Sequence, residues 1–272
     1  MTYKTFFALI LFSFFLLPIS SQIKLKTYAN KIDSGYEFLA DNGEYCPVSV
    51  KLTLKLNNMT SSNGNNKVFV IPARTKGYLI TKLKVKKRGK YGYGSKTRYN
   101  YGSHLKKGYD KEYIYNLPFN KNKEFKVYQG YNGSFSHENE NSLDFTMPIG
   151  TNINASREGI VVKVVEENSK NCGKRDCIKF NNLVLIYHVD GTFSEYVHIK
   201  KNGALVKVGD KIKKGQLIAK SGNVGFSTGP HLHFVVFRQK IGGRETLKTK
   251  FKINDGVKSV YLEEKEKYYR NY

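Results

Sequence analysis

Apolar residues alternate with polar ones through much of the chain, which predicts β-strands. In "CPVSVKLTLKL" (46–56) an apolar residue recurs at every second position, so these side chains share one face of an extended strand. They are Val48, Val50, Leu52, Leu54 and Leu56. "KVFVIPA" (67–73) and "YLITKLKV" (78–85) follow after polar turns. We expect an antiparallel sheet with one solvated face here, within a small sandwich-like N-terminal β-domain over residues 22–117.

A second group of predicted strands begins after residue 118. Its segments are "GIVVKVVEE" (159–167), "LVLIYHV" (183–189), "TFSEYVHI" (192–199) and "HLHFVVF" (231–237). Between them, Gly209 and Gly215 indicate short strands joined by tight turns. The sequence contains no long amphipathic helical pattern. We therefore predict an all-β protein, with a second antiparallel β-sheet domain over residues 118–250 and a basic, aromatic C-terminal tail over 251–272.

Residues 86–115 are rich in Tyr, Lys and Gly. Basic residues interleaved with aromatic ones can bind single-stranded nucleic acid or stack on sugars. The same composition is typical of a flexible hairpin or loop on a basic protein. We favour the loop, and we do not expect nucleic acid as a partner.

The first 21 residues have the pattern of a secretory signal peptide. Lys4 precedes an apolar run from Phe6 to Leu17, which is too short to span a bilayer, and small residues follow. We expect cleavage before Gln22 and export to the periplasm, the cell wall or the extracellular space. No later stretch is long and apolar enough to span a membrane, so we expect no transmembrane segment in the mature chain.

The chain is strongly basic. Its formal net charge of +24 falls to +23 without the signal peptide, which contains one lysine and no acid. Such a charge favours polyanions, and for an exported protein we expect acidic cell-envelope polymers. The alternative is that the lysines simply form a solvated surface. They occur along the whole chain, which favours a general electrostatic tether.

The three cysteines indicate one possible crosslink. Cys172 and Cys177 enclose the turn-like sequence "GKRD" and can close a small disulfide ring in an oxidising compartment. A zinc ribbon would need a second pair. Cys46 is left over, either as a buried thiol or as an unpaired one.

The segment "GPHLHF" (229–234) places two of the six histidines two residues apart. In a strand, His231 and His233 lie side by side on one face, and Leu232 points into the core. Two adjacent imidazoles are poor candidates for two cations, so a metal ion would account for at least one of them. The alternative is a pair of surface histidines in a hairpin.

Three other segments carry candidate chemistry. His137 lies in a polar loop, and Asp144 lies between apolar residues on a strand, where a metal, an arginine or backbone amides would have to balance its charge. In "SEYVHI", alternation places His198 on one face of the strand and Glu195 on the other. We expect His188 to be structural or at a strand end.

These motifs together resemble one known family. "SHENENSLDF", "YVHI" and "GNVGFSTGPHLHF", in this order over about residues 125–240, are similar to the lysostaphin-like zinc metallopeptidases that cut peptidoglycan cross-links. The resemblance implies that His137, Asp144 and His233 bind one Zn²⁺ per chain and that His198 and His231 are catalytic. It leaves open which of these two histidines is the base. The implied substrates are peptidoglycan stem peptides or cross-bridges.

The sequence departs from the family pattern at a few positions. Val235 stands where many relatives have an acid, and Val224 replaces a threonine. The Gly-rich loop near the cleft corresponds to "SKNCGKRDC" (168–177). Two alternative functions share the motifs: a secreted protease acting on Gly-rich proteins, and a non-catalytic wall-binding or activator relative.

Overall fold

The computed structural model describes residues 23–272, and nearly all of its regular structure is β-strand. The all-β class predicted from the sequence is confirmed. The expected signal peptide, residues 1–21, lies outside the described residues. Within the described part of the chain, no helix is long and apolar enough to cross a membrane.

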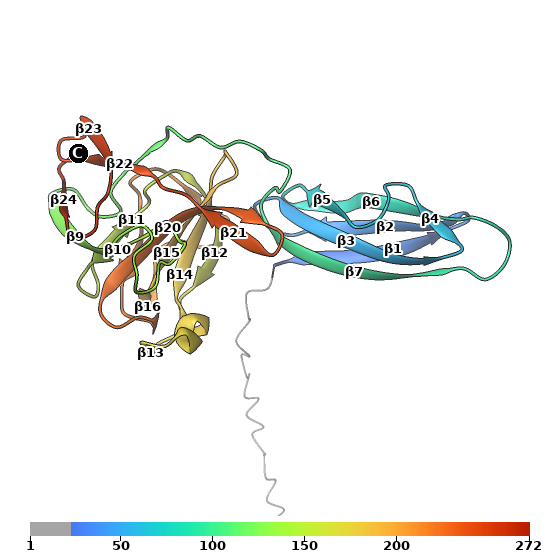
Figure 1. Cartoon of the computed structure of the whole chain (residues 1–272), viewed down its shortest axis with the longest axis horizontal. Helices are drawn as coiled ribbons and strands as arrows, with labels where there is room; N and C mark the ends of the chain where they lie inside the picture. The colour runs from blue at the N-terminus through green and yellow to red at the C-terminus, as the bar shows by residue number, and fades with distance from the viewer. Residues whose placement is uncertain (1–22) are drawn as a thin grey trace, which may run out of the picture.

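Two sheets form an elongated N-terminal module, which we define as strands β1 to β7 (Figure 1). The first sheet has the order β1 (Leu25–Ile32), β2 (Gly35–Asn42), β6 (Thr75–Val85) and β4 (Met59–Ser61). The second has the order β5 (Lys67–Ile71), β3 (Val48–Asn57) and β7 (Gly92–Tyr101). Both sheets contribute to one apolar core, into which the alternating residues of β3 point.

Part of the Tyr-rich stretch differs from the expected loop. Residues 92–101 form the ten-residue strand β7, which pairs with β3 along its whole length. Along "KTRYNY" (96–101), Thr97, Tyr99 and Tyr101 lie opposite core-facing residues of β3, and the residues between them point outward. The flexible-loop prediction was therefore wrong for this segment.

A nine-stranded sheet forms the centre of the C-terminal module, which we define as β8 to β24. Its order is β17 (Lys211–Ile212), β12 (Gly159–Val165), β14 (Leu183–Tyr187), β15 (Phe193–Val197), β20 (His231–Lys240), β10 (Ser142–Thr146), β9 (Lys123–Gln129) and β24 (Lys267–Arg270), with β21 (Gly243–Thr246) beside β20. One face of this sheet packs on the larger apolar core of the protein.

Short sheets surround this central sheet. They are β11 (Asn152–Asn154), β18 (Leu217–Ser221) and β16 (Ile199–Ala204); β23 (Lys258–Tyr261), β22 (Lys250–Ile253) and β8 (Ile114–Tyr115); and the parallel pair β13 (Asn171–Cys172) and β19 (Gly225–Phe226). The one 3₁₀ helix of the described chain is η1 (Arg175–Phe180).

The C-terminal residues are part of the fold. β24 pairs with β9 at the edge of the central sheet, and β22 pairs with β8. Phe251 and Leu262 are buried in the main core. The prediction of a tail over 251–272 was wrong, because these aromatic and apolar residues cover the core.

The two modules share an apolar interface. Phe193 of β15 and Phe237 of β20 stack at a centroid distance of 5.5 Å and belong to the same buried cluster as the N-terminal strands. Burying a Phe side chain stabilises a fold by about 1.5–3 kcal/mol, and part of this gain for each ring comes from the contact between the modules. Val235 lies in this interface, where an acidic side chain would be buried among apolar ones.

Candidate metal centre

Three side chains that are distant in sequence meet on the open face of the central sheet. Asp144 of β10 lies directly opposite His233 of β20, and His137 reaches them from the loop between β9 and β10. His233 Nδ1 is 2.9 Å from Asp144 Oδ1, and His137 Nε2 is 3.3 Å from Asp144 Oδ2. One ligand atom of each residue lies within 4.8 Å of the others, so the group can hold a metal ion.

A backbone contact sets the tautomer of His137. Its Nδ1 lies 2.9 Å from the carbonyl oxygen of Gly130. Because a carbonyl only accepts hydrogen bonds, Nδ1 carries the proton and the neutral ring keeps a free lone pair on Nε2. That lone pair points at Asp144 and His233, as a metal ligand requires.

The carboxylate of Asp144 is almost fully buried. Burial raises its pKa, but the nearby imidazoles of His137 and His233 outweigh burial and hold the pKa well below its ordinary value. Gln129, opposite Asp144 on β9, donates from Nε2 to Asp144 Oδ2 at 3.2 Å and to Ser136 Oγ at 2.7 Å. Gln129 thus links the loop that carries His137 to the carboxylate.

His198 faces this group through an unusual backbone conformation. It follows the last residue of β15 and has a φ of +65°, in the left-handed region. The positive φ interrupts the strand alternation, so His198 lines the same cleft as Glu195 and Val197, while Tyr196 is buried in the core. The prediction that Glu195 points away from His198 was therefore wrong.

The ring of His198 is held by a main-chain carbonyl. Its Nδ1 lies 2.7 Å from the carbonyl oxygen of Val224, which leaves Nε2 as the acceptor of the neutral ring. Burial, followed by the charges of His231 and His233, lowers the pKa of His198 to about 3. The hydrogen bond to His198 uses the backbone carbonyl of residue 224, so it does not depend on the valine side chain that replaces the threonine of the family pattern.

His231 lies beside His198, with a ring-centroid distance of 4.5 Å. Its Nδ1 is 2.8 Å from the carbonyl oxygen of Gly229 and 3.2 Å from Ser227 Oγ. The opposite nitrogen, Nε2, lies 3.8 Å from Asp144 Oδ1. His198 and His231 thus both have Nδ1 held at a carbonyl, so the neutral ring of each has its unprotonated nitrogen at Nε2.

Sequence reasoning missed Tyr128. It lies on β9 and lines the cleft, and its ring contacts His231 edge-on at a centroid distance of 5.6 Å. Burial, followed by the charge of Asp144, raises the pKa of Tyr128, so the hydroxyl remains a hydrogen-bond donor. An exposed tyrosine in the strand that precedes the His137 loop was the available signal.

These side chains line a cleft of about 800 Å³. One wall is the loop between β9 and β10, with Phe135 and Glu138, and the other is formed by η1 and the segment after β19. None of the lining residues of the described chain precedes Tyr128. The cleft is therefore formed by the C-terminal module alone.

Glu195 is already paired. Its Oε1 lies 3.4 Å from Arg244 Nη1, and Nη2 of the same guanidinium donates to both carboxylate oxygens of Glu140 at 2.9 and 3.1 Å. Arg244 thus joins the β20–β21 hairpin to the loop that carries His137. Glu195 therefore has a cationic partner, whereas His198 and His231 each contact a main-chain carbonyl through Nδ1.

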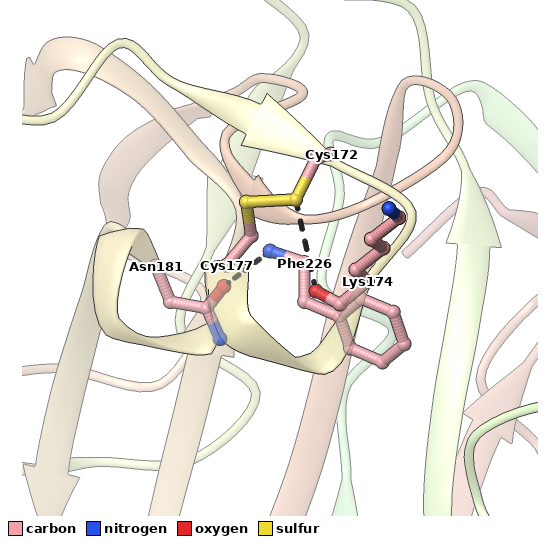
Figure 2. Close-up of a disulfide and its surroundings, with 5 residues drawn as sticks. All are labelled: Cys172, Lys174, Cys177, Asn181 and Phe226. Atoms are coloured by element: carbon pink, nitrogen blue, oxygen red, sulfur yellow. Dashed lines mark hydrogen bonds between the residues drawn. A yellow bond between two sulfur atoms is a disulfide. The ribbon is translucent and has the colours of Figure 1, made fainter.

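A disulfide holds one wall of the cleft. Cys172 at the end of β13 is bonded to Cys177 in η1, with Cα atoms 5.9 Å apart (Figure 2). Asn181 Oδ1 accepts a hydrogen bond from the Phe226 backbone at 2.9 Å (Figure 2). A Cβ on Gly225 would overlap this oxygen, so only glycine fits there.

The third cysteine, Cys46, lies in the N-terminal module and is a buried free thiol.

The remaining two histidines lie outside the cleft. His188 is fully buried, with Nδ1 2.6 Å from the carbonyl oxygen of Glu158 and Nε2 3.0 Å from Ser194 Oγ. Burial and the charge of Arg157 lower its pKa to about 4. His104 Nδ1 accepts a hydrogen bond from the Ile241 backbone. Both therefore have structural roles.

A buried His–Asp–His group that can hold a metal ion thus lies beside two further histidines. Residues 138–245 match the sequence model described as Peptidase family M23. This match lies within the C-terminal module and covers less than half of the chain.

Individual relatives agree with the family. The chain is 42% identical over 94 residues to the peptidoglycan DD-endopeptidase ShyA of Vibrio cholerae, covering 35% of this chain and 19% of ShyA. It is 39% identical over 106 residues to the glycyl-glycine endopeptidase ALE-1 of Staphylococcus capitis, covering 39% and 25%. The chain spans between 17% and 26% of the length of the curated relatives it matches.

Among solved structures, the catalytic domain of lysostaphin from Staphylococcus simulans is 30% identical, with 46% of this chain and 87% of that chain covered and a TM-score of 0.34.

Proposed function

We propose that the protein is an exported zinc endopeptidase that hydrolyses peptide cross-links of peptidoglycan. The observation that carries the proposal is the convergence of His137, Asp144 and His233 with His198 and His231 in one cleft of a family M23 module. In this proposal residues 118–250 are the peptidase domain and residues 22–117 a separate β-domain.

The donor set fits one zinc ion. Two imidazole nitrogens and one carboxylate oxygen are a ligand set that zinc takes in catalytic sites, where a fourth position stays open. Asp144 and His233 line the cleft, and His233 is the least buried of the three residues, so an ion held here would be reachable from the cleft. Bound zinc would lower the pKa of a coordinated water and polarise the scissile carbonyl.

The two non-ligand histidines supply proton transfer. Their Nδ1 atoms are held at main-chain carbonyls, so Nε2 of a neutral ring can accept a proton from water and later donate it to the leaving amine. The hydroxyl of Tyr128 is a further donor beside His231, placed to stabilise negative charge on the carbonyl oxygen. We assign His198 and His231 to catalysis without assigning the base to either.

Retention of the whole set argues against a non-catalytic wall-binding or activator role. A protein that only bound peptidoglycan would need neither the buried carboxylate nor the two histidines held at carbonyls. Burying these groups costs free energy, which a catalytic role explains.

The bond that is cut is best tested with defined peptides. ShyA is named a DD-endopeptidase and ALE-1 a glycyl-glycine endopeptidase, so the test pair is a cross-linked stem-peptide dimer and pentaglycine. We expect chelator-sensitive cleavage of at least one of them by the mature chain and none by the Asp144→Ala variant. Cleavage of pentaglycine and a Gly-rich protein, with intact stem peptides, would favour the secreted-protease alternative.

The same proposal places the protein outside the cytoplasm. It includes the signal peptide, a location in the periplasm, cell wall or extracellular space, and attraction to acidic envelope polymers through the net charge of +23 of the processed chain. Detection of the processed chain, beginning at Gln22, outside spheroplasts would support this part. A chain retained in the cytoplasm with its first 21 residues would contradict it.

A further inference from the structure

Basic residues occur along the whole chain, but the net positive charge is distributed unevenly because the acidic residues are not evenly spread. Residues 45–109 contain 15 Lys and Arg side chains and not one Asp or Glu. The other 207 residues contain 31 basic and 22 acidic side chains. More than half of the net charge of +24 therefore lies in a quarter of the sequence, and almost all of that segment belongs to the N-terminal module.

The fold gathers four of these cations on one sheet face. Positions 51, 53 and 55 of β3 alternate with buried leucines and valines and therefore point outward. Across the antiparallel pair, Lys51 lies opposite Arg98 of β7, and Thr53 lies opposite Lys96. Directly opposed residues share a face, so Lys51, Lys55, Lys96 and Arg98 project together. We call these four residues the cationic face.

The cationic face has no internal counter-charge. None of its four members takes part in the ion pairs of the described chain. Like charges directly opposite each other destabilise a sheet, yet Lys51 and Arg98 are paired in this way. Along a strand such side chains repeat at about 6.7 Å, and neighbouring strands are about 4.8 Å apart. The result is a two-row array of cations whose repulsion an anionic ligand would relieve.

The tyrosines of β7 lie on its opposite face. Tyr93 packs edge-on against Tyr36 and Phe38, and Tyr101 is buried in the core of the module. No aromatic residue of β3 or β7 shares the outward face with the cations. Proteins that bind single-stranded nucleic acid usually stack bases on aromatic rings. The cationic face therefore fits a polymer that is recognised by its charges alone.

We propose that the cationic face binds a linear polyol-phosphate polymer of the cell envelope; the choice of an envelope polymer rests on the proposed exported function. Phosphate oxygens accept charge-assisted hydrogen bonds from both Lys and Arg. Four more cations, Lys86, Lys87, Arg88 and Lys90, lie in the β6–β7 loop, which is at the end of the module remote from the peptidase sheet (Figure 1). A polymer bound along the cationic face and this loop would leave the cleft of the C-terminal module free.

The test is binding of poly(glycerol phosphate) to the mature chain across a salt series. The variant replaces Lys51, Lys55, Lys96 and Arg98 by Gln. The matched control replaces four exposed lysines of the C-terminal module that form no ion pair: Lys201, Lys207, Lys211 and Lys213. Both variants lose the same charge, and their folds are compared by thermal unfolding.

We expect the cationic-face variant to bind at least tenfold more weakly at 0.15 M salt. The slope of log K against log salt should shrink by about 3, for four lost contacts at about 0.7 each on a single-stranded polyanion. The control should stay within twofold of the unaltered chain. Replacing Lys51, Lys55 and Lys96 by Arg should preserve binding.

Three results would overturn the proposal. One is an equal loss in the control, which would mean that only net charge matters. Another is tighter binding of single-stranded DNA with the same number of phosphates, and the third is preferential binding of vesicles containing phosphatidylglycerol. Because binding is measured without hydrolysis, failure of the peptidase assays leaves this test intact, and the reverse also holds.

Discussion

The role of Gln129 provides a sharp test of how the metal ligands are positioned. Its amide donates to the carboxylate of Asp144 at 3.2 Å and to Ser136 Oγ at 2.7 Å, and its oxygen accepts from the Ser136 backbone at 3.3 Å. Replacing Gln129 by Leu keeps the approximate volume and removes all three hydrogen bonds. Asp144 then loses its neutral donor, and the loop that carries His137 loses its connection to β9.

Two independent estimates of the free-energy cost of Gln129→Leu agree. A hydrogen bond to a charged group contributes about 1.5–3 kcal/mol. Residues that orient metal ligands typically change metal affinity 10- to 100-fold, and at about 1.4 kcal/mol for each factor of ten this corresponds to about 1.4–2.8 kcal/mol. We therefore expect the Gln129→Leu variant to bind Zn²⁺ 10- to 100-fold more weakly than the unaltered protein.

Competition of the protein with a chromogenic zinc chelator measures this affinity directly. The matched control is Gln239→Leu, which removes an amide that accepts a hydrogen bond from Asn100 at the module interface, away from the cleft. Unchanged zinc affinity in the Gln129→Leu variant would refute the positioning role. So would an equal loss in the control.

Three further outcomes are expected. Folding lowers the pKa of His188 from 6.5 to about 4, so as the pH falls the unfolded chain protonates this imidazole before the folded chain does. The free energy of unfolding should therefore drop by about 3 kcal/mol between pH 6.5 and pH 4. Denaturant titrations of the His188→Gln variant should lack this contribution to the pH dependence. Replacing Cys172 and Cys177 by Ala should cost about 2 kcal/mol, given their five-residue separation, and raise KM more than it lowers kcat. Steady-state kinetics should show Glu195→Gln within tenfold of the normal kcat, and His198→Ala reduced at least 100-fold; the opposite ranking would make the glutamate the base.

Strand alternation predicted much of the architecture, and it failed where a single backbone angle departs from the strand. His231 and His233 lie on one face of β20, as the period of two requires. His198 does not obey that period because its φ is positive. A histidine in the left-handed region is uncommon, and nothing in "YVHIK" indicates it.

The sequence also failed to predict strands that form only by pairing with distant strands. β7 carries glycines, serine and charged residues, so its own composition is typical of a loop. It becomes a strand because β3 offers a ten-residue edge. β22 and β24 likewise form by pairing with β8 and β9, segments more than 100 residues earlier. Such long-range pairing has no local signature in a single sequence.

Supporting residues were the hardest to foresee. The proposed metal ligands and catalytic histidines could be proposed from the sequence because a long motif marks them, and the fold brings them into one cleft. Gln129 and Tyr128 belong to no motif and act through neighbours that only the folded sheet brings together. For Gln129 the one hint in the sequence was its position two residues after the apolar Val127, which places both side chains on the same face of β9.

The central claim, metal-dependent hydrolysis of peptidoglycan, is tested most directly by mass spectrometry of purified sacculi digested with the mature chain. We predict new peptide fragments whose ends identify the cleaved bond. They should disappear with a chelator, return with added Zn²⁺ and be absent with the Asp144→Ala variant. No fragments from zinc-loaded, folded protein, or fragments that persist in chelator, would contradict the account.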